Sequence, residues 1–153
     1  MCLLLETIKI ENGQIRNLEY HNRRFYASRK ALFGIGDEVD LGSLVTVPAD
    51  LGTGVFRCRI LYREEIEKIE FIPHVDRKVR SLKLVSTDDF DYSYKYADRR
   101  LLESLFEQRG ECDEILIVRK DFITDTSISN IIFRRSDGSW ITPDTPLLNG
   151  TMR

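Results

Sequence analysis

The dipeptide Asn12-Gly13 separates two short stretches of mixed apolar and polar residues near the start of the chain. Asn-Gly is a strong local signal for a two-residue hairpin turn, because both residues tolerate a positive φ. The dipeptide therefore predicts paired strands over about 3–10 and 14–18. The run from Tyr20 to Phe33 contains no Gly or Pro, and residues along it recur at spacings of three and four. This spacing predicts a helix that ends at Gly34.

The remainder of the chain divides into strand-like stretches and one further helical stretch. A loop over 36–54, which contains several Gly residues and one Pro, precedes expected strands over 55–62, 66–72 and 79–85. Residues 1–85 are therefore expected to form an α+β lobe made of a hairpin, a helix and an antiparallel sheet. A polar linker over 86–91 marks the expected boundary. Residues 86–153 are expected to form a β-rich lobe with a helix over 98–109 and strands over 113–118, 122–125, 130–134 and 140–142.

Composition excludes several classes of protein. The chain has 153 residues, is 42% hydrophobic and has a formal net charge of −2, which gives no general attraction to nucleic acid. Three widely spaced cysteines without a CxxC motif indicate neither a disulfide framework nor a zinc knuckle, and two histidines are too few for a His-rich metal site. No segment has the length of apolar sequence that a membrane span needs. We expect a reduced, cytoplasmic protein with no metal, no membrane partner and no nucleic-acid partner.

Lys95 lies between two tyrosines, immediately before the second expected helix. An amine in an aromatic, partly desolvated setting has its charged form disfavoured, which favours a nucleophile that forms Schiff bases. The alternative is a lysine whose stem covers the aromatic residues while its amine reaches solvent.

Arg24 lies on the first helix, where it flanks the expected buried face. A half-buried arginine needs an anion, and a phosphate group would suit it. A salt bridge between the two lobes is the alternative.

Two segments near the end of the chain combine polar residues with apolar strands. Asp125 lies within or beside a strand, where aspartate is depleted, so its carboxylate needs a cationic or hydrogen-bonding partner. The alternative is a turn capped by the neighbouring hydroxyl groups. In the segment 147–153, Gly150 allows close approach of the backbone, and successive N–H groups there could bind an anion. An ordinary turn is the alternative.

Taken in order, these segments resemble the class IV aminotransferases, the fold-type IV pyridoxal-phosphate enzymes. This family includes branched-chain and D-amino-acid aminotransferases and 4-amino-4-deoxychorismate lyase. The matching segments are His21-Asn-Arg-Arg24 with Ser28, Lys95-Tyr-Ala-Asp98-Arg99, Asp113-Glu-Ile-Leu116, Thr124-Asp125 with Asn130-Ile-Ile-Phe133, Thr142-Pro143, and Leu148-Asn-Gly-Thr-Met-Arg153.

The resemblance implies two lobes with the cofactor, pyridoxal 5'-phosphate, in the cleft between them. It implies that Lys95 forms the Schiff base with the cofactor and moves protons at the substrate. Asp125 would pair with the pyridine nitrogen, and Leu148 would pack on the ring. Arg24 and the backbone of Thr151 and Met152 would hold the phosphate. The expected partners are a small amino-acid-like substrate and a second copy of the chain in a homodimer.

Three departures from the family pattern qualify these expectations. The first lobe is short and lacks the usual GDG before its first hairpin, and Asp125 stands where Glu is usual. The sequence also stops soon after Gly150, so we expect the second lobe to be incomplete and cofactor binding to be weak. The expected activity is that of a 4-amino-4-deoxychorismate lyase. The alternatives are a branched-chain or D-amino-acid aminotransferase, or a degenerate homologue that acts as a binding protein.

Overall fold

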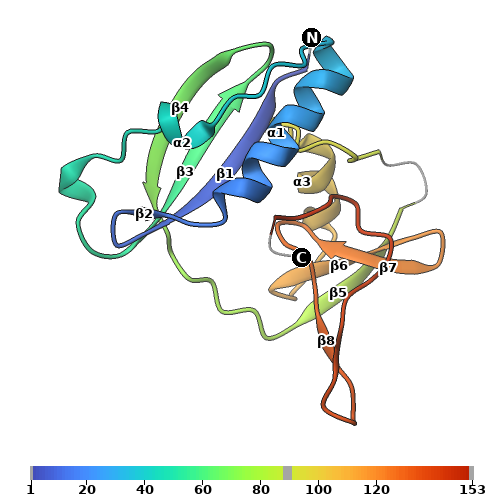
Figure 1. The fold of residues 1–153 in the computed structure, drawn as a ribbon. Coiled ribbons are helices and arrows are strands. Elements are labelled where there is room, and N and C mark those ends of the chain that lie inside the picture. Colours follow the sequence, from blue (N-terminus) through green and yellow to red (C-terminus); the bar gives the residue numbers. More distant parts are fainter. Residues whose placement is uncertain (1, 88–90, 152–153) are drawn as a thin grey trace. The chain divides into compact units, whose positions relative to one another are not determined.

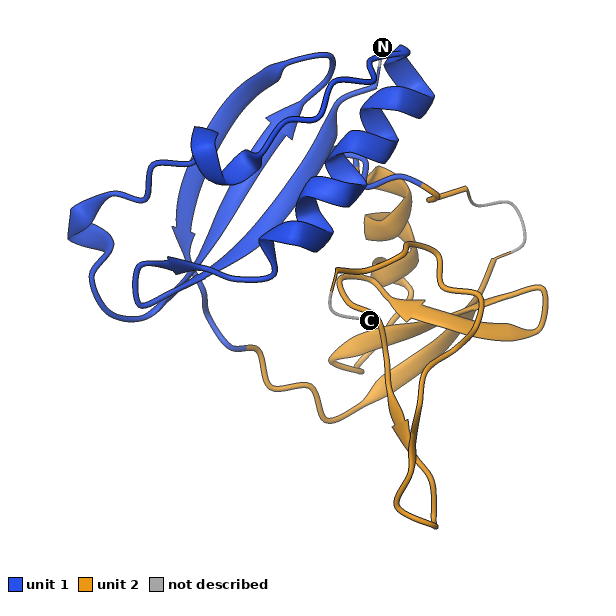
Figure 2. Ribbon diagram, in the orientation of Figure 1, with its two compact units in different colours: residues 1–76, 94–98 blue, residues 77–93, 99–153 orange. Residues whose placement is uncertain are grey.

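The computed structural model describes residues 2–87 and 91–151 and divides the chain into two compact units. Unit 1 contains residues 1–76 and 94–98, and unit 2 contains residues 77–93 and 99–153 (Figure 2). Each unit has its own sheet and its own helix (Figure 1). None of the helices in the described part of the chain combines the length and hydropathy of a membrane span.

Unit 1 is built on a four-stranded antiparallel sheet in the order β2-β1-β3-β4. The strands are β1 (Leu4–Glu11), β2 (Gln14–Ile15), β3 (Val55–Tyr62) and β4 (Ile66–Pro73). The turn between β1 and β2 has positive φ at both central residues, 50° at Asn12 and 74° at Gly13. This is the type I′ geometry whose twist matches the flanking strands, so the predicted hairpin is confirmed.

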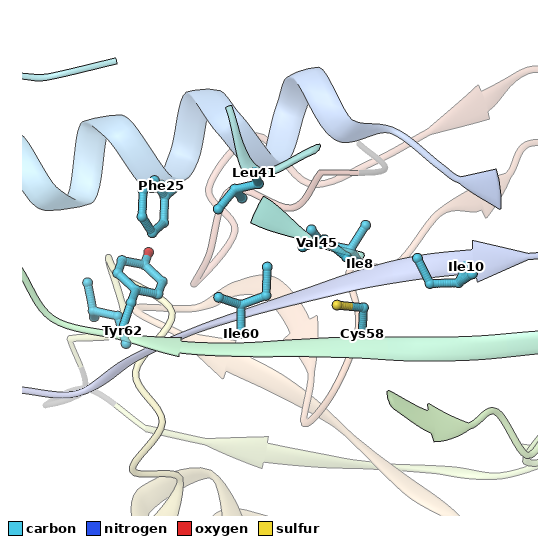
Figure 3. Close-up of a cluster of buried hydrophobic side chains, with 9 residues drawn as sticks. Ile8, Ile10, Phe25, Leu41, Val45, Cys58, Ile60 and Tyr62 are labelled. Carbon is cyan, nitrogen blue, oxygen red and sulfur yellow. The ribbon is translucent and has the colours of Figure 1, made fainter. Parts of the chain in front are cut away.

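Helix α1 (Leu18–Phe33) ends at Gly34, as the sequence predicts, and contributes to the core of unit 1. The loop that follows holds only the short helix α2 (Leu41–Leu44) and a 3-10 turn over Ala49–Leu51. In the core, Phe25 from α1 lies against Tyr62 from β3, with ring centroids 4.5 Å apart (Figure 3). The remaining core side chains come mainly from β1, β3 and the loop after α1: Leu4, Ile8, Ile10, Leu41, Val45, Cys58 and Ile60.

Unit 2 contains a three-stranded sheet in the order β5-β6-β7, with β5 (Leu82–Ser86), β6 (Glu114–Arg119) and β7 (Phe122–Thr126). Strand β5 is parallel to β6, and β7 is antiparallel to β6. Helix α3 (Arg100–Glu107) connects β5 to β6 along the chain and buries Leu102 and Leu105. A separate two-stranded hairpin, β8 (Phe133–Arg134) with β9 (Trp140–Ile141), follows.

The prediction for the strand over 79–85 is right about its existence and wrong about its partner. We expected this strand to complete the antiparallel sheet of the first lobe, but β5 pairs in parallel with β6 in unit 2. The side chain of Asp113 connects the starts of the two strands, because one carboxylate oxygen accepts from Arg80 N at 2.8 Å and from Ser81 N at 3.0 Å. The compact units consequently differ from the expected lobes over 1–85 and 86–153.

Candidate functional site

Lys95 lies in unit 1, beside the start of β1. Its backbone carbonyl accepts a hydrogen bond from Leu5 N at 2.9 Å, and Ala97 N donates to Leu3 O at 2.9 Å. Tyr94 and Tyr96, which flank Lys95, pack against the core of unit 1, and their rings meet edge to face with centroids 6.2 Å apart. The lysine backbone is therefore held by the sheet that forms the centre of this unit, and the side chain is half-buried.

Arg24 is paired with a carboxylate of its own unit. Its Nε donates to Glu6 Oε1 at 2.7 Å and its Nη2 donates to Glu6 Oε2 at 2.5 Å, which forms a bidentate ion pair. The Arg24 side chain is 15% exposed and that of Glu6 is fully buried. The sequence-based requirement for an anion at Arg24 is thus met within unit 1, by a residue of β1. The binding of phosphate by Arg24 stays a prediction.

Glu6 is the residue that sequence reasoning missed. Besides Arg24, it accepts a hydrogen bond from His21 Nδ1 at 2.6 Å, and His21 is itself buried. Burial raises the pKa of the Glu6 carboxyl, but the hydrogen bonds and charges of Arg24 and His21 outweigh burial and hold this pKa below its usual value. The signal in the sequence was a carboxylate in register with the apolar residues Leu4, Ile8 and Ile10 of one strand.

Asp125 lies at the end of β7 in unit 2 and is 6% exposed. Its Oδ1 accepts from Asn130 Nδ2 at 2.6 Å, and its Oδ2 accepts from Leu147 N at 2.7 Å and from Leu148 N at 3.2 Å. The sequence-based expectation of hydrogen-bonding partners for this carboxylate is confirmed. All three donors are neutral, so they solvate the carboxylate without supplying an opposite charge.

The turn after Asp125 is capped by hydroxyl groups, as the alternative interpretation of this segment proposed. Thr126 Oγ1 accepts from Ser129 N at 3.0 Å, and Thr126 N donates to Ser129 O at 2.9 Å. Arg99, next to α3, donates from Nη2 to Ser127 O at 2.8 Å. The turn and the hydrogen-bonded carboxylate therefore coexist, and the turn holds Asn130 where it can reach Asp125.

Asn130 connects Asp125 to the segment that contains Leu148 and Gly150. Its Nδ2 donates to Asp125 Oδ1 and also to Leu148 O at 3.1 Å. A Cβ atom at position 150 would overlap Asn130 Oδ1 and lie 2.9 Å from Asn130 Cγ. Glycine is therefore required at position 150 by the close approach of the Asn130 amide.

Replacing Gly150 with alanine is expected to destabilise the protein by about 1–3 kcal/mol, because the new methyl group must displace the Asn130 amide from Asp125. Asn130→Ala removes the overlapping atoms, so the double variant should lose less free energy of unfolding than the sum of the two single variants. The difference should be about 1 kcal/mol or more in urea denaturation. Gly36→Ala is the matched control, since a Cβ there meets nothing within 4 Å. Additive losses would contradict this account of Gly150.

Leu148 and Thr151, two further predicted site residues, belong to this segment of unit 2. Leu148 is half-buried and bonds Asp125 through its backbone N–H, so the structure brings these two predicted residues together. Thr151 is half-buried in a turn. Met152 lies outside the described residues. No group of three or more His, Cys, Asp or Glu side chains suited to a metal occurs among the residues of 2–87 and 91–151.

The chain is similar in sequence and in structure to several known proteins. No family model matches the sequence. An uncharacterized protein of Haemophilus influenzae is 43% identical over 155 residues, an alignment that covers all of this chain and 82% of that protein. A crystal structure from Haemophilus somnus, provisionally assigned as a 4-amino-4-deoxychorismate lyase, is 40% identical with a TM-score of 0.90. That match covers 99% of this chain and 80% of the H. somnus chain. This chain belongs to the class IV aminotransferase family.

More distant structures show the same class IV fold. A hypothetical aminotransferase from Mycobacterium tuberculosis, solved in a pyridoxal-phosphate-bound form, is 17% identical with a TM-score of 0.78. The match covers 98% of this chain and 64% of the M. tuberculosis chain. The sequence-based recognition of the family from its ordered motifs is therefore confirmed.

Proposed function

We propose that this class IV chain is a pyridoxal-phosphate-dependent enzyme with the reaction of a 4-amino-4-deoxychorismate lyase. The observation that carries the proposal is the environment of Asp125. Among residues 2–87 and 91–151, the buried Asp125 carboxylate is bonded only by neutral donors, so none of these residues supplies an opposite charge to it. A protonated pyridine nitrogen supplies the opposite charge that such a carboxylate requires.

The hydrogen bonds that Asp125 accepts leave it with acceptor capacity for one more donor. An ionised carboxylate has about four lone-pair positions, and Asn130, Leu147 and Leu148 use three of them. Two of the donors are backbone N–H groups, so the carboxylate is held in one orientation by the main chain. These contacts support a role for Asp125 toward the pyridine nitrogen, and Leu148, bonded to Asp125 through its backbone N–H, would pack on the ring.

Each of the other site residues has a role in the proposed enzyme. Pyridoxal phosphate, when bound, supplies an electron-withdrawing ring for the electrons released at the substrate α-carbon. Lys95 would hold the cofactor through Nζ, and its amine would move a proton at that carbon. Asp125 would keep the proton on the pyridine nitrogen. Arg24 and the backbone N–H groups of Thr151 and Met152 would hold the phosphate.

The lyase assignment is supported by the H. somnus relative, whose 40% identity extends over nearly the whole chain. The relatives assigned as amino-acid aminotransferases, such as that of Mesorhizobium loti at 22% identity, share the fold alone. We also infer a small amino-acid-like substrate and a homodimer, because the family resemblance implies both. Light scattering distinguishes the mass of one chain from the mass of two.

We expect the protein to convert 4-amino-4-deoxychorismate into equal amounts of pyruvate and 4-aminobenzoate with no 2-oxo acid added. Both products are measured by chromatography as a function of time. Amino transfer from a branched-chain or D-amino acid to 2-oxoglutarate, with no pyruvate released from 4-amino-4-deoxychorismate, would replace the lyase assignment by an aminotransferase. Cofactor binding without either reaction would identify a binding protein.

A further inference from the structure

The two oxygens of the Asp125 carboxylate have different partners in unit 2. Oδ2 accepts from the backbone N–H groups of Leu147 at 2.7 Å and Leu148 at 3.2 Å, whereas Oδ1 accepts from Asn130 Nδ2 at 2.6 Å. In the part of the chain that the structure describes, Asn130 is the only donor to Oδ1. A carboxylate oxygen has about two lone-pair positions, so the backbone uses both of those on Oδ2. The acceptor capacity that remains is therefore on Oδ1.

The side-chain amide of Asn130 fits its neighbours in one orientation. Nδ2 carries two hydrogens and donates to Asp125 Oδ1 and to Leu148 O, the latter at 3.1 Å. An oxygen atom in the place of Nδ2 would face a carboxylate and a carbonyl, which are both acceptors. At the other end of the amide, Asn130 Oδ1 occupies space that a Cβ at Gly150 would overlap. The N–H group is thus directed at Asp125 Oδ1 before any ligand binds.

The backbone that carries Asn130 is held to the backbone that carries Asp125. These two residues form an isolated antiparallel bridge, and Thr126 N donates to Ser129 O at 2.9 Å within the turn between them. Thr126 Oγ1 also accepts from Ser129 N at 3.0 Å. The carboxylate and the amide therefore stand on one closed turn, and all of their partners belong to unit 2.

We propose that Asn130 is a positioning residue that makes Asp125 Oδ1 the acceptor for the pyridine N–H of the cofactor. This inference rests on the proposed function, in which Asp125 pairs with the pyridine nitrogen. Asn130 holds Oδ1 through a charge-assisted hydrogen bond and leaves it one lone-pair position. Oδ2 could accept a further donor only by losing one of its two backbone hydrogen bonds. The carboxylate consequently needs no reorientation when the ring binds.

The test compares Asn130→Ala with the wild-type chain in titrations with pyridoxal phosphate and with its deaza analogue, in which a C–H group replaces the ring nitrogen. We expect the variant to raise the dissociation constant for pyridoxal phosphate by about tenfold or more, and that for the deaza analogue by less than about twofold. Ser129→Ala is the matched control in the same turn. It removes the contact between Ser129 Oγ and Thr126 Oγ1 at 3.1 Å and should change neither constant. If Asn130→Ala does not fold, Asn130→Ser, whose side chain is too short to reach Oδ1, replaces it.

A second measurement needs no cofactor. In the wild-type protein both Nδ2 hydrogens of Asn130 should exchange with solvent more slowly than those of the exposed Gln14, as seen by nuclear magnetic resonance, because both are bonded. Asp125→Asn should speed this exchange. Its amide oxygen stays with the N–H groups of Leu147 and Leu148, so its NH2 group faces the NH2 group of Asn130. Exchange at Asn130 as fast as at Gln14 in the wild type would overturn the inference.

The outcomes of the titrations separate this inference from the proposed function. A wild-type chain that binds neither ligand overturns both, and so does one that binds the two ligands equally, because Asp125 then has no role toward the ring nitrogen. A preference for pyridoxal phosphate that is unchanged in the folded Asn130 variant overturns the role of Asn130 alone. Equal weakening of both ligands also overturns that role, because it indicates that Asn130 acts only through the fold of the segment 147–150.

Discussion

Replacing Lys95 with alanine is expected to abolish covalent attachment of pyridoxal phosphate and to lower turnover by about a thousandfold or more, since the variant loses both the nucleophile and the proton carrier. The fold should be unaffected, because Lys95 bonds β1 through its backbone carbonyl, which alanine retains. Borohydride reduction followed by peptide mass spectrometry locates the attached cofactor. Circular dichroism compares the folded state of the variant with that of the wild type.

Lys83→Ala is the matched control for this experiment. Lys83 is an exposed residue of β5 and lies in the strand that pairs with β6. Its removal should leave both the attachment and the turnover unchanged. If the cofactor adduct persists in Lys95→Ala, or is lost in Lys83→Ala, then Lys95 is not the attachment site. The inference drawn from its aromatic neighbours would then be wrong.

Local sequence patterns predicted the elements of unit 1 well, because the signals there act over short distances. The Asn12-Gly13 turn requires positive φ at two adjacent residues, and α1 follows from the spacing of Phe25 and its neighbours. The partner of β5 was not predictable in the same way. An alternating pattern identifies a strand but not its neighbour, and β6 begins 28 residues after the end of β5 in the sequence.

In the candidate site, too, the sequence indicated which residues need a partner but not which distant residues provide one. The sequence indicated correctly that Arg24 needs an anion and that Asp125 needs hydrogen-bond donors. It did not identify Glu6, which is 18 residues from Arg24, or Leu147 N, which is 22 residues from Asp125. Both contacts connect separate elements of one unit, so only folding brings the partners together. A charged residue within an apolar strand row was the one local sign of either contact.

The structure also changes what the Asp125 carboxylate is expected to do. The resemblance to class IV enzymes gives it one role, toward the pyridine nitrogen. In unit 2 it also fixes the backbone at Leu147 and Leu148, the segment that leads to Gly150 and Thr151. Asp125 therefore joins the proposed ring site to the segment proposed to bind phosphate, and its substitution has two separable consequences.

Asp125→Asn is expected to lower turnover by at least about a hundredfold, because an uncharged amide cannot hold the proton on the pyridine nitrogen as a carboxylate does. The amide oxygen of asparagine can still accept from Leu147 N and Leu148 N. The hydrogen-exchange rates of these two amides should therefore change by a much smaller factor than the turnover rate. Asp121→Asn, in the exposed turn before β7, makes the same chemical change and should cause no loss of activity.

If the hydrogen-exchange rate at Leu147 N rises by as large a factor as turnover falls, the carboxylate acts by anchoring the backbone. If turnover is unchanged, Asp125 does not reach the ring, and the shorter side chain at this family position has lost the role that glutamate has there.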